Sequence, residues 1–143
     1  MALPFHNVVS LSGWIGNDTI HTVNLGLAAD GSAIIKADEG RAMTIDTSGP
    51  NKFKLAGEGD AVIGILVTFE DRISGPVGAV GFEYIMPFKL KAADLAAVGD
   101  TVVGAAGTDG RGGWVKKSGS NTPYTNFIAE KATDASTVVV VRL

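Results

Sequence analysis

Turn-forming residues interrupt this sequence every few positions, and this feature restricts its possible folds more than any other. Short runs rich in β-branched and aromatic residues are each closed by Gly, Asp, Asn or Pro, which is typical of strands joined by tight turns. The chain holds 19 glycines in 143 residues, nearly twice the usual share of about 7%. We therefore predict an all-β protein, a compact barrel or sandwich-like domain.

The predicted strands follow these short runs along the chain. They cover residues 33–37, 42–46, 51–55, 61–70, 77–82, 84–89, 101–104, 113–117, 126–131 and 137–143. Apolar residues occupy both alternating sets in 61–69, which predicts a central strand buried on both faces. Gly64 within it indicates a bulge or a close approach of another backbone. The final run, 137–143, is β-prone and short of charge, so we expect an internal strand or a strand paired across a subunit contact.

The remaining segments are a single candidate helix and an irregular N-terminus. Residues 91–97 are rich in helix-forming side chains, and Gly99 would end that helix after two turns. Apolar and polar residues mix without a sustained period from 7 to 27, which leaves two alternatives open, an extended arm or one more pair of strands. We predict an arm or peripheral strands over residues 1–30 and one β-rich domain over 31–143.

The reactive side chains do not form a recognisable catalytic or metal-binding pattern. The chain has no cysteine and two histidines, His6 and His21, so thiolate chemistry is excluded and a histidine zinc site lacks ligands at the usual spacing. The glycine-rich stretch 104–113 lacks the Gly-Lys-Ser/Thr of a phosphate loop and leads into a strand-like run. We expect a hairpin loop there, no cofactor, no metal and no enzymatic activity.

Charge and hydropathy restrict the possible partners. The formal net charge is −3, and the longest basic run is Lys116-Lys117, so we expect no binding to nucleic acid through its phosphates. No segment reaches the roughly 18 to 20 apolar residues of a membrane-spanning helix. The first residues lack the pattern of a secretory signal. We expect a protein that is made and used in a cytoplasm, or in an assembly that forms there.

The order of turns and strands in the last two-thirds of the chain resembles one known family. A strand at 60–69 is followed by a Gly-Pro turn at 75–76, and a Gly-Asp turn at 99–100 leads into a short strand. The chain then closes on an apolar strand, and the matching stretches are 60–69, 75–81, 88–91, 98–104, 127–131 and 137–143. This pattern resembles the small capsid decoration, or cement, proteins of tailed bacteriophages.

The resemblance implies a structural role in the virion. Such proteins bind the outer face of an expanded icosahedral capsid, often as trimers, and tie neighbouring capsomers together against the pressure of the packaged DNA. The expected partners are the major capsid protein and further copies of the chain, most simply as a homotrimer. The expected location is the outer surface of the capsid, and the host cytoplasm during assembly.

Two sets of side chains are candidates for contacts with a partner. No family motif covers the first 30 residues, so the contacts proposed there are our own inference. We expect an N-terminal arm to carry four apolar capsid anchors, Phe5, Trp14, Ile15 and Ile20. Candidate contacts in loops are Arg111, Trp114 and Tyr124. Trp114, Tyr124 and the loop 118–124 also suit an alternative function, a small carbohydrate- or ligand-binding β-barrel for surface attachment, with polar groups beside aromatic rings. An enzyme that uses loop carboxylates is the third and weakest alternative.

Overall fold

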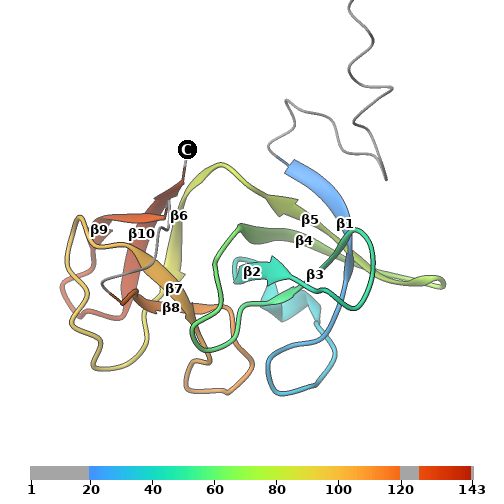
Figure 1. Ribbon diagram of the computed structural model, residues 1–143, viewed down its shortest axis with the longest axis horizontal. Coiled ribbons are helices and arrows are strands. Elements are labelled where there is room, and N and C mark those ends of the chain that lie inside the picture. The colour runs from blue at the N-terminus through green and yellow to red at the C-terminus, as the bar shows by residue number, and fades with distance from the viewer. Residues whose placement is uncertain (1–19, 120–125, 143) are drawn as a thin grey trace, which may run out of the picture.

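The computed structural model describes residues 20–119 and 126–142, and apart from one short 3₁₀ helix its regular elements are all strands, joined by turns and loops (Figure 1). The elements in chain order are β1 (Ile20–Leu25), the 3₁₀ helix η2 (Lys36–Asp38), β2 (Ala42–Ile45), β3 (Lys52–Leu55), β4 (Gly64–Arg72), β5 (Gly75–Gly81), β6 (Tyr84–Lys89), β7 (Val102–Ala105), β8 (Trp114–Lys117), β9 (Phe127–Lys131) and β10 (Thr137–Arg142). The prediction of an all-β fold is confirmed.

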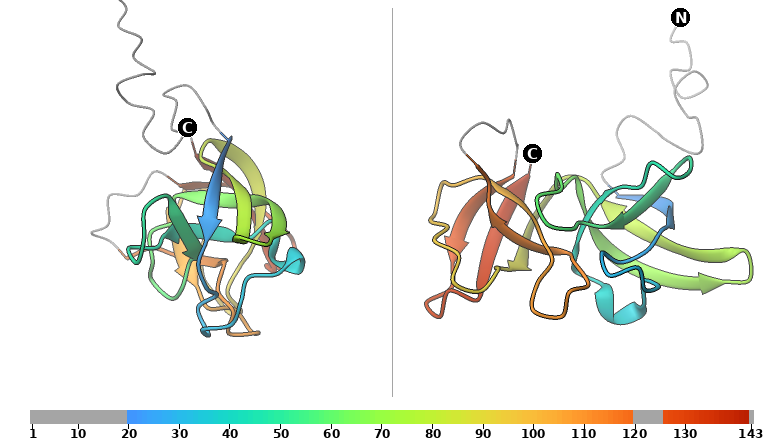
Figure 2. Two further views of the ribbon diagram at one scale, coloured as in Figure 1. Left: turned by 90° about the vertical axis from the view of Figure 1, so that its right-hand side faces the viewer. Right: turned by 60° about the horizontal axis from the view of Figure 1, so that its bottom comes forward.

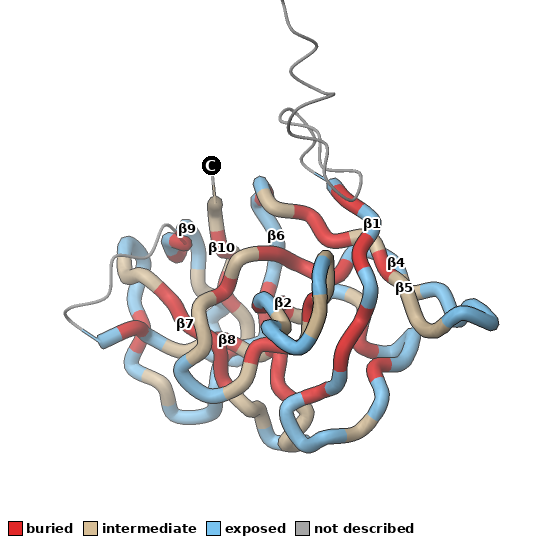
Figure 3. Tube along the Cα trace, turned by 45° about the vertical axis from the view of Figure 1, so that its right-hand side comes forward, coloured by how far each residue is buried: buried red, intermediate tan, exposed pale blue. Residues whose placement is uncertain are grey.

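The first half of the chain forms a closed barrel with the strand order β1-β3-β2-β4-β5. Strand β1 closes it, because it pairs in parallel with β3 and antiparallel with β5. Its side chains alternate between the solvent and the barrel interior, where Val23 and Leu25 are buried (Figure 3). Residues 20–25, within the segment that the sequence assigns to an arm or to peripheral strands, are therefore a barrel strand paired on both edges.

The second half contains a three-stranded sheet with the order β6-β10-β9 and the hairpin β7-β8. Isolated bridges, Leu90 to Val115 and Thr101 to Phe127, connect the hairpin to both edges of the sheet. The final apolar run lies between β6 and β9, which confirms the internal strand expected there. The two halves lie side by side along the long axis, and the β4–β5 hairpin and β9 lie at opposite ends (Figures 1 and 2).

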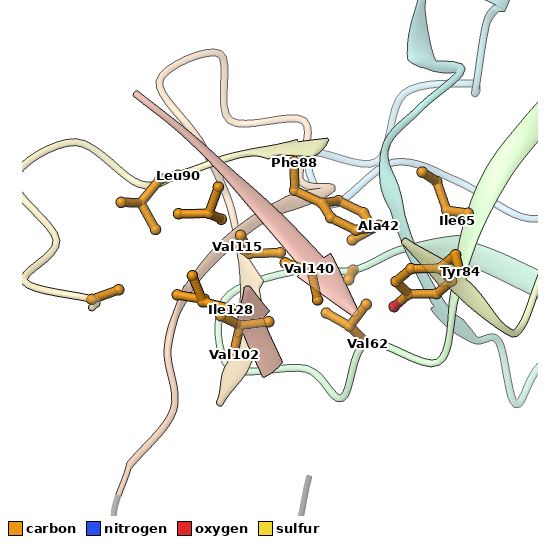
Figure 4. Packing of buried hydrophobic residues seen from close by; sticks show 13 residues of the cluster. Ala42, Val62, Ile65, Tyr84, Phe88, Leu90, Val102, Val115, Ile128 and Val140 are labelled. Atoms are coloured by element: carbon orange, nitrogen blue, oxygen red, sulfur yellow. The ribbon is translucent and has the colours of Figure 1, made fainter. Parts of the chain in front are cut away.

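Two adjoining clusters of buried apolar side chains form the interior. One fills the barrel, and the other fills the space enclosed by the second half but also includes Ala42 and Ile65 from barrel strands (Figure 4). Backbone hydrogen bonds cross the same boundary, from Ala42 N to the Gly113 carbonyl at 2.9 Å and from Gly104 N to the Asp60 carbonyl at 2.8 Å. Packing and main-chain bonds thus join the two halves directly.

The helix predicted over 91–97 is wrong, because side chains bind the backbone groups that a helix would use. Asp94 Oδ1 accepts a hydrogen bond from Ala96 N at 2.8 Å, and Asp100 Oδ2 accepts one from Ala97 N at 2.8 Å. Ala93 has a φ of 60°, which lies in the left-handed region. A stretch of two turns gains too little from helix formation to compete with these bonds.

Two strand predictions in the barrel also need correction. Residues 33–37 form no strand beyond a single bridge at Ala33, and η2 follows because the Asp38 carboxylate accepts the Ile35 N–H at 2.9 Å. Strand β4 is buried on both faces only at its first three residues, 64–66, and its far end projects with β5 as an exposed hairpin. Gly64 lies in a close approach, since a Cβ there would lie 3.0 Å from the Gly81 carbonyl oxygen.

Candidate protein-binding face

The sheet β6-β10-β9 exposes apolar side chains on the face that points away from its core. The register aligns Ile85 with Val141 and Val141 with Phe127, so one row of apolar side chains crosses all three strands. Ile85 is 66% exposed, Phe127 is 49% exposed and Val141 is half-buried. Pro87 and Val139 pair in the neighbouring row. We call these five residues the outer apolar face.

The opposite face of the same sheet is buried, so its strands are apolar on both sides. Phe88, Ile128 and Val140 point into the core of the second half (Figure 4), and Val138 belongs to the same buried cluster. Antiparallel sheets with one solvated face usually alternate apolar and polar residues. Strand β10 departs from that alternation, because its residues 138–141 are all valine. This departure indicates that the outer face is suited to contact with another surface.

A hydrogen-bonded tyrosine fixes the end of this sheet against the barrel half. The Tyr84 hydroxyl donates to Asn126 Oδ1 at 2.5 Å, and Asn126 Nδ2 donates to the Val62 carbonyl at 2.7 Å. Burial raises the pKa of Tyr84 to about 12, so the hydroxyl stays protonated and keeps donating. The ring also meets Phe88 edge-on, with centroids 5.5 Å apart. The exposed row beginning at Ile85 therefore lies on a rigid support.

Arg111, a predicted loop contact, is engaged within the chain. Its Nε donates to Asp38 Oδ1 at 3.1 Å and one terminal nitrogen donates to Asp38 Oδ2 at 2.5 Å, while the other donates to Ser32 Oγ at 2.6 Å. The bond to Asp38 raises the pKa of the guanidinium. Asp38 is only 1% exposed. These contacts hold the β7–β8 loop against the segment before η2.

Trp114, the second loop candidate, is half-buried and partly covered. A Cβ on Gly107 would lie 2.6 Å from Trp114 Nε1, so the Gly107 backbone sits against the five-membered ring of the indole. Lys89 Nζ lies 5.4 Å from the ring centroid. Two shallow hollows of about 300 and 500 Å³ flank Trp114, Lys89 and Thr137. The Gly107 backbone and Lys89 thus cover part of the indole, and the two hollows lie beside it.

The other candidates divide between β1 and positions outside the described residues. Ile20 is the first residue of β1, pairs with Gly81 and is 55% exposed. Phe5, Trp14, Ile15 and Tyr124 lie outside the described residues. Of the predicted site residues, the structure therefore places Ile20 on the barrel and Arg111 and Trp114 at the β7–β8 loop and the start of β8. It adds a face that sequence reasoning missed, although the unbroken apolar run at the C-terminus was a signal for it.

The charged groups of residues 20–119 and 126–142 are mainly paired with one another. Glu58 accepts hydrogen bonds from Lys91 Nζ at 2.8 Å and Lys116 Nζ at 2.5 Å. Glu39 Oε1 accepts the Phe69 N–H at 2.8 Å, and Glu70 pairs with Arg72 at 2.8 Å. Within these ranges no three His, Asp or Glu side chains gather in a way that could hold a metal ion.

Comparisons with protein-family models, curated proteins and solved structures give no match for this chain. In the part of the chain that the structure describes, no helix has the length and apolar character needed to cross a bilayer. The functional argument therefore depends on the fold, on the outer apolar face and on the resemblance of the turn and strand pattern.

Proposed function

We propose that this chain is a structural virion protein, a capsid decoration protein that binds the outer surface of an expanded phage head. In this role it bridges neighbouring capsomers and stabilises the shell against the pressure of packaged DNA. The observation that carries the proposal is the outer apolar face, which provides protein-binding area on a rigid sheet. The turn and strand pattern of residues 60–143, which resembles the decoration proteins, supports it.

The energetics of such a face suit a protein that binds a symmetric shell in many copies. Covering a partly exposed Ile, Val or Phe side chain contributes about 1 to 2 kcal/mol. A row of three such side chains therefore gives a single copy of the chain only a modest free energy of binding. Several such contacts combine when the copies are linked, here as the proposed homotrimer, because later contacts form at high effective concentration.

The charge of the chain agrees with a position outside the shell. A net charge of −3 gives no general attraction to DNA phosphates. The proposed partners are the major capsid protein and further copies of this chain. The proposed location is the outer capsid surface, after a period in the host cytoplasm during assembly.

Co-sedimentation with expanded capsids tests the proposal. We expect the unmodified chain to pellet with expanded heads at a fixed ratio, and Ile85→Lys to lower the bound fraction at least about tenfold, since a charge in the row must be desolvated on binding. The control is Ile73→Lys, at the fully exposed tip of the β4–β5 hairpin, which should bind normally.

Two results would contradict this function. One is the absence of binding to expanded heads by the unmodified chain together with saturable binding to a glycan, which would favour the carbohydrate-binding alternative. The other is unchanged capsid binding by a folded Ile85→Lys variant, which would remove the outer apolar face from the contact.

A further inference from the structure

Two hollows meet at the half-buried Trp114, and we call them the Trp114 hollows. The larger, of about 500 Å³, lies between the end of β6, the turn before β10 and the β7–β8 loop. The smaller, of about 300 Å³, lies between β6 and the segment from η2 to β2. Lys89, Trp114 and Thr137 line both. These volumes fall in the range of small-ligand sites, about 300 to 1,000 Å³, and the shared wall allows one ligand to occupy both hollows.

The shared wall combines an aromatic ring with a cation. Lys89 Nζ lies 5.4 Å from the centroid of the Trp114 ring. Within residues 20–119 and 126–142, no ion pair joins Lys89 to an acidic side chain. The ammonium group can therefore donate hydrogen bonds to a ligand. The part of the indole that borders the hollows offers an apolar surface to C–H groups.

Acceptors and hydroxyl groups line the larger hollow beside this wall. Asp134 Oδ1 accepts hydrogen bonds from Ser136 N at 3.0 Å and from Ser136 Oγ at 2.7 Å. These bonds lower the pKa of the Asp134 carboxyl, so the group is an ionised acceptor at neutral pH. Oδ2 takes part in neither bond. Thr108 and Thr137 add two hydroxyl groups to the same hollow.

Two alanines with left-handed backbones also line the larger hollow. Ala93 has a φ of 60° and Ala135 a φ of 57°. In the described part of the chain, the other non-glycine residue with a positive φ is Asn51. This conformation is unfavourable for a residue that has a Cβ, and such residues cluster at ligand sites. The backbone thus marks the hollow independently of the side chains that line it.

The charges around the Trp114 hollows favour a ligand without net charge. Lys89 and Asp134 contribute one charge of each sign to the larger hollow, and Arg41 and Glu39 do the same in the smaller one. A phosphate group would meet a carboxylate in either hollow. A neutral sugar has hydroxyl groups that donate to a carboxylate and accept from an ammonium group. Its C–H face can pack on an indole ring.

We propose that the Trp114 hollows bind a neutral oligosaccharide, with one pyranose unit against Trp114, Lys89 and Asp134 and the next unit in the smaller hollow. The inference goes beyond the proposed function, because it assigns a small-ligand site and needs no capsid. Many copies of such a site on one shell would bind a glycan-bearing surface by avidity.

Titration with four neutral disaccharides, maltose, cellobiose, lactose and N,N′-diacetylchitobiose, tests the site by calorimetry and two-dimensional NMR. We expect at least one to bind saturably and to shift the Trp114 indole signal together with the amide signals of residues 89, 136 and 137. Lys89→Met should weaken that binding about tenfold and Thr137→Val about threefold or more, since each removes a hydrogen-bonding group. Lys117→Met is the control, because Lys117 is an exposed lysine of the same hairpin and lines neither hollow.

Three results would overturn the proposal. The first is the absence of saturable binding by all four disaccharides. The second is tighter binding of glucuronic acid or inorganic phosphate than of any of them, which would indicate an anion site at Lys89. The third is sugar binding that the folded Lys89→Met and Thr137→Val variants leave unchanged.

The NMR shifts of the unmodified chain decide the matter if these variants fail to fold. Shifts confined to residues that line neither hollow would contradict the proposal. No capsid is present in these titrations, so the sugar site and the capsid role can fail independently. A chain that binds both a disaccharide and expanded heads would support both.

Discussion

At the scale of single residues, Asp38 organises the contact between the barrel half and the β7–β8 loop. Its buried carboxylate lies 2.5 Å from Arg111 and 3.1 Å from Arg41, and it also accepts the Ile35 N–H. Arg41 continues the network to Asp109 at 2.6 Å. The sequence shows only a carboxylate in an Asp-Glu pair, because its partner Arg111 lies 73 positions away in the chain.

We expect Asp38→Asn to destabilise the protein by about 2 to 4 kcal/mol, because it leaves two partly buried guanidinium groups without their shared counter-ion. Urea unfolding followed by circular dichroism measures the change. The matched control is Glu70→Gln, which removes the exposed pair with Arg72 and should have a much smaller effect, because water screens an exposed pair. Equal effects of the two substitutions would argue against a stabilising role for the Asp38 network.

At the scale of elements, the positions of individual strands were predictable to different degrees. The strands 84–89, 113–117, 126–131 and 137–143 are confirmed to within one residue at each end, because β-branched runs between turn residues have few alternatives. For residues 20–25 the sequence left an arm and a strand as open alternatives, since His21 faces inward and Ile20 faces outward. The polar His21 is therefore buried and the apolar Ile20 is exposed, which is the reverse of what their polarity indicates.

Gly64 permits the close packing of β4 on β5, and Gly64→Ala should destabilise the protein by about 1 to 3 kcal/mol. The added methyl group would overlap a Val80 methyl and lie 3.0 Å from the Gly81 carbonyl oxygen. The control is Gly49→Ala, where the nearest atom is a flexible lysine carbon at 3.5 Å. Chemical denaturation of both variants measures the change in the free energy of unfolding. A Gly64→Ala protein as stable as the unmodified chain would contradict the close packing of β4 on β5.

At the scale of the whole molecule, Glu58 links the two halves electrostatically. It lies in the turn between β3 and β4, and its partners Lys91, Lys116 and the Ala106 N–H belong to the second half. The hydrogen bonds from Lys116, then Lys91, then Ala106 lower the pKa of the Glu58 carboxyl from 4.5 to about 2.

This lowered pKa predicts that the contribution of Glu58 to the stability of the folded chain depends on pH. Because the pKa is lower in the folded chain than in the unfolded chain, the stabilisation from Glu58 is present above about pH 4.5 and is lost as the pH falls toward about 2. The carboxylate is 43% exposed, so water weakens the effect, and we expect at most about 1 kcal/mol.

Urea midpoints of the unmodified chain and of Glu58→Gln should therefore differ at pH 6 and converge near pH 2. Asp134→Asn serves as a control, since Asp134 bonds only locally to Ser136 and does not connect the halves. A difference between the Glu58→Gln and unmodified midpoints that stays constant from pH 6 to pH 2 would contradict the assignment.

The sequence by itself determined that this is a β protein, because turn residues and β-branched runs act locally and need no distant partner. It also determined that the last strand must be covered, since four valines in a row cannot remain unpaired in water. It could not determine that β1 closes a barrel, that Arg111 binds Asp38, or that Ile85, Val141 and Phe127 form one row. Those features depend on the register between strands far apart in the chain, and only the tertiary structure decides that register.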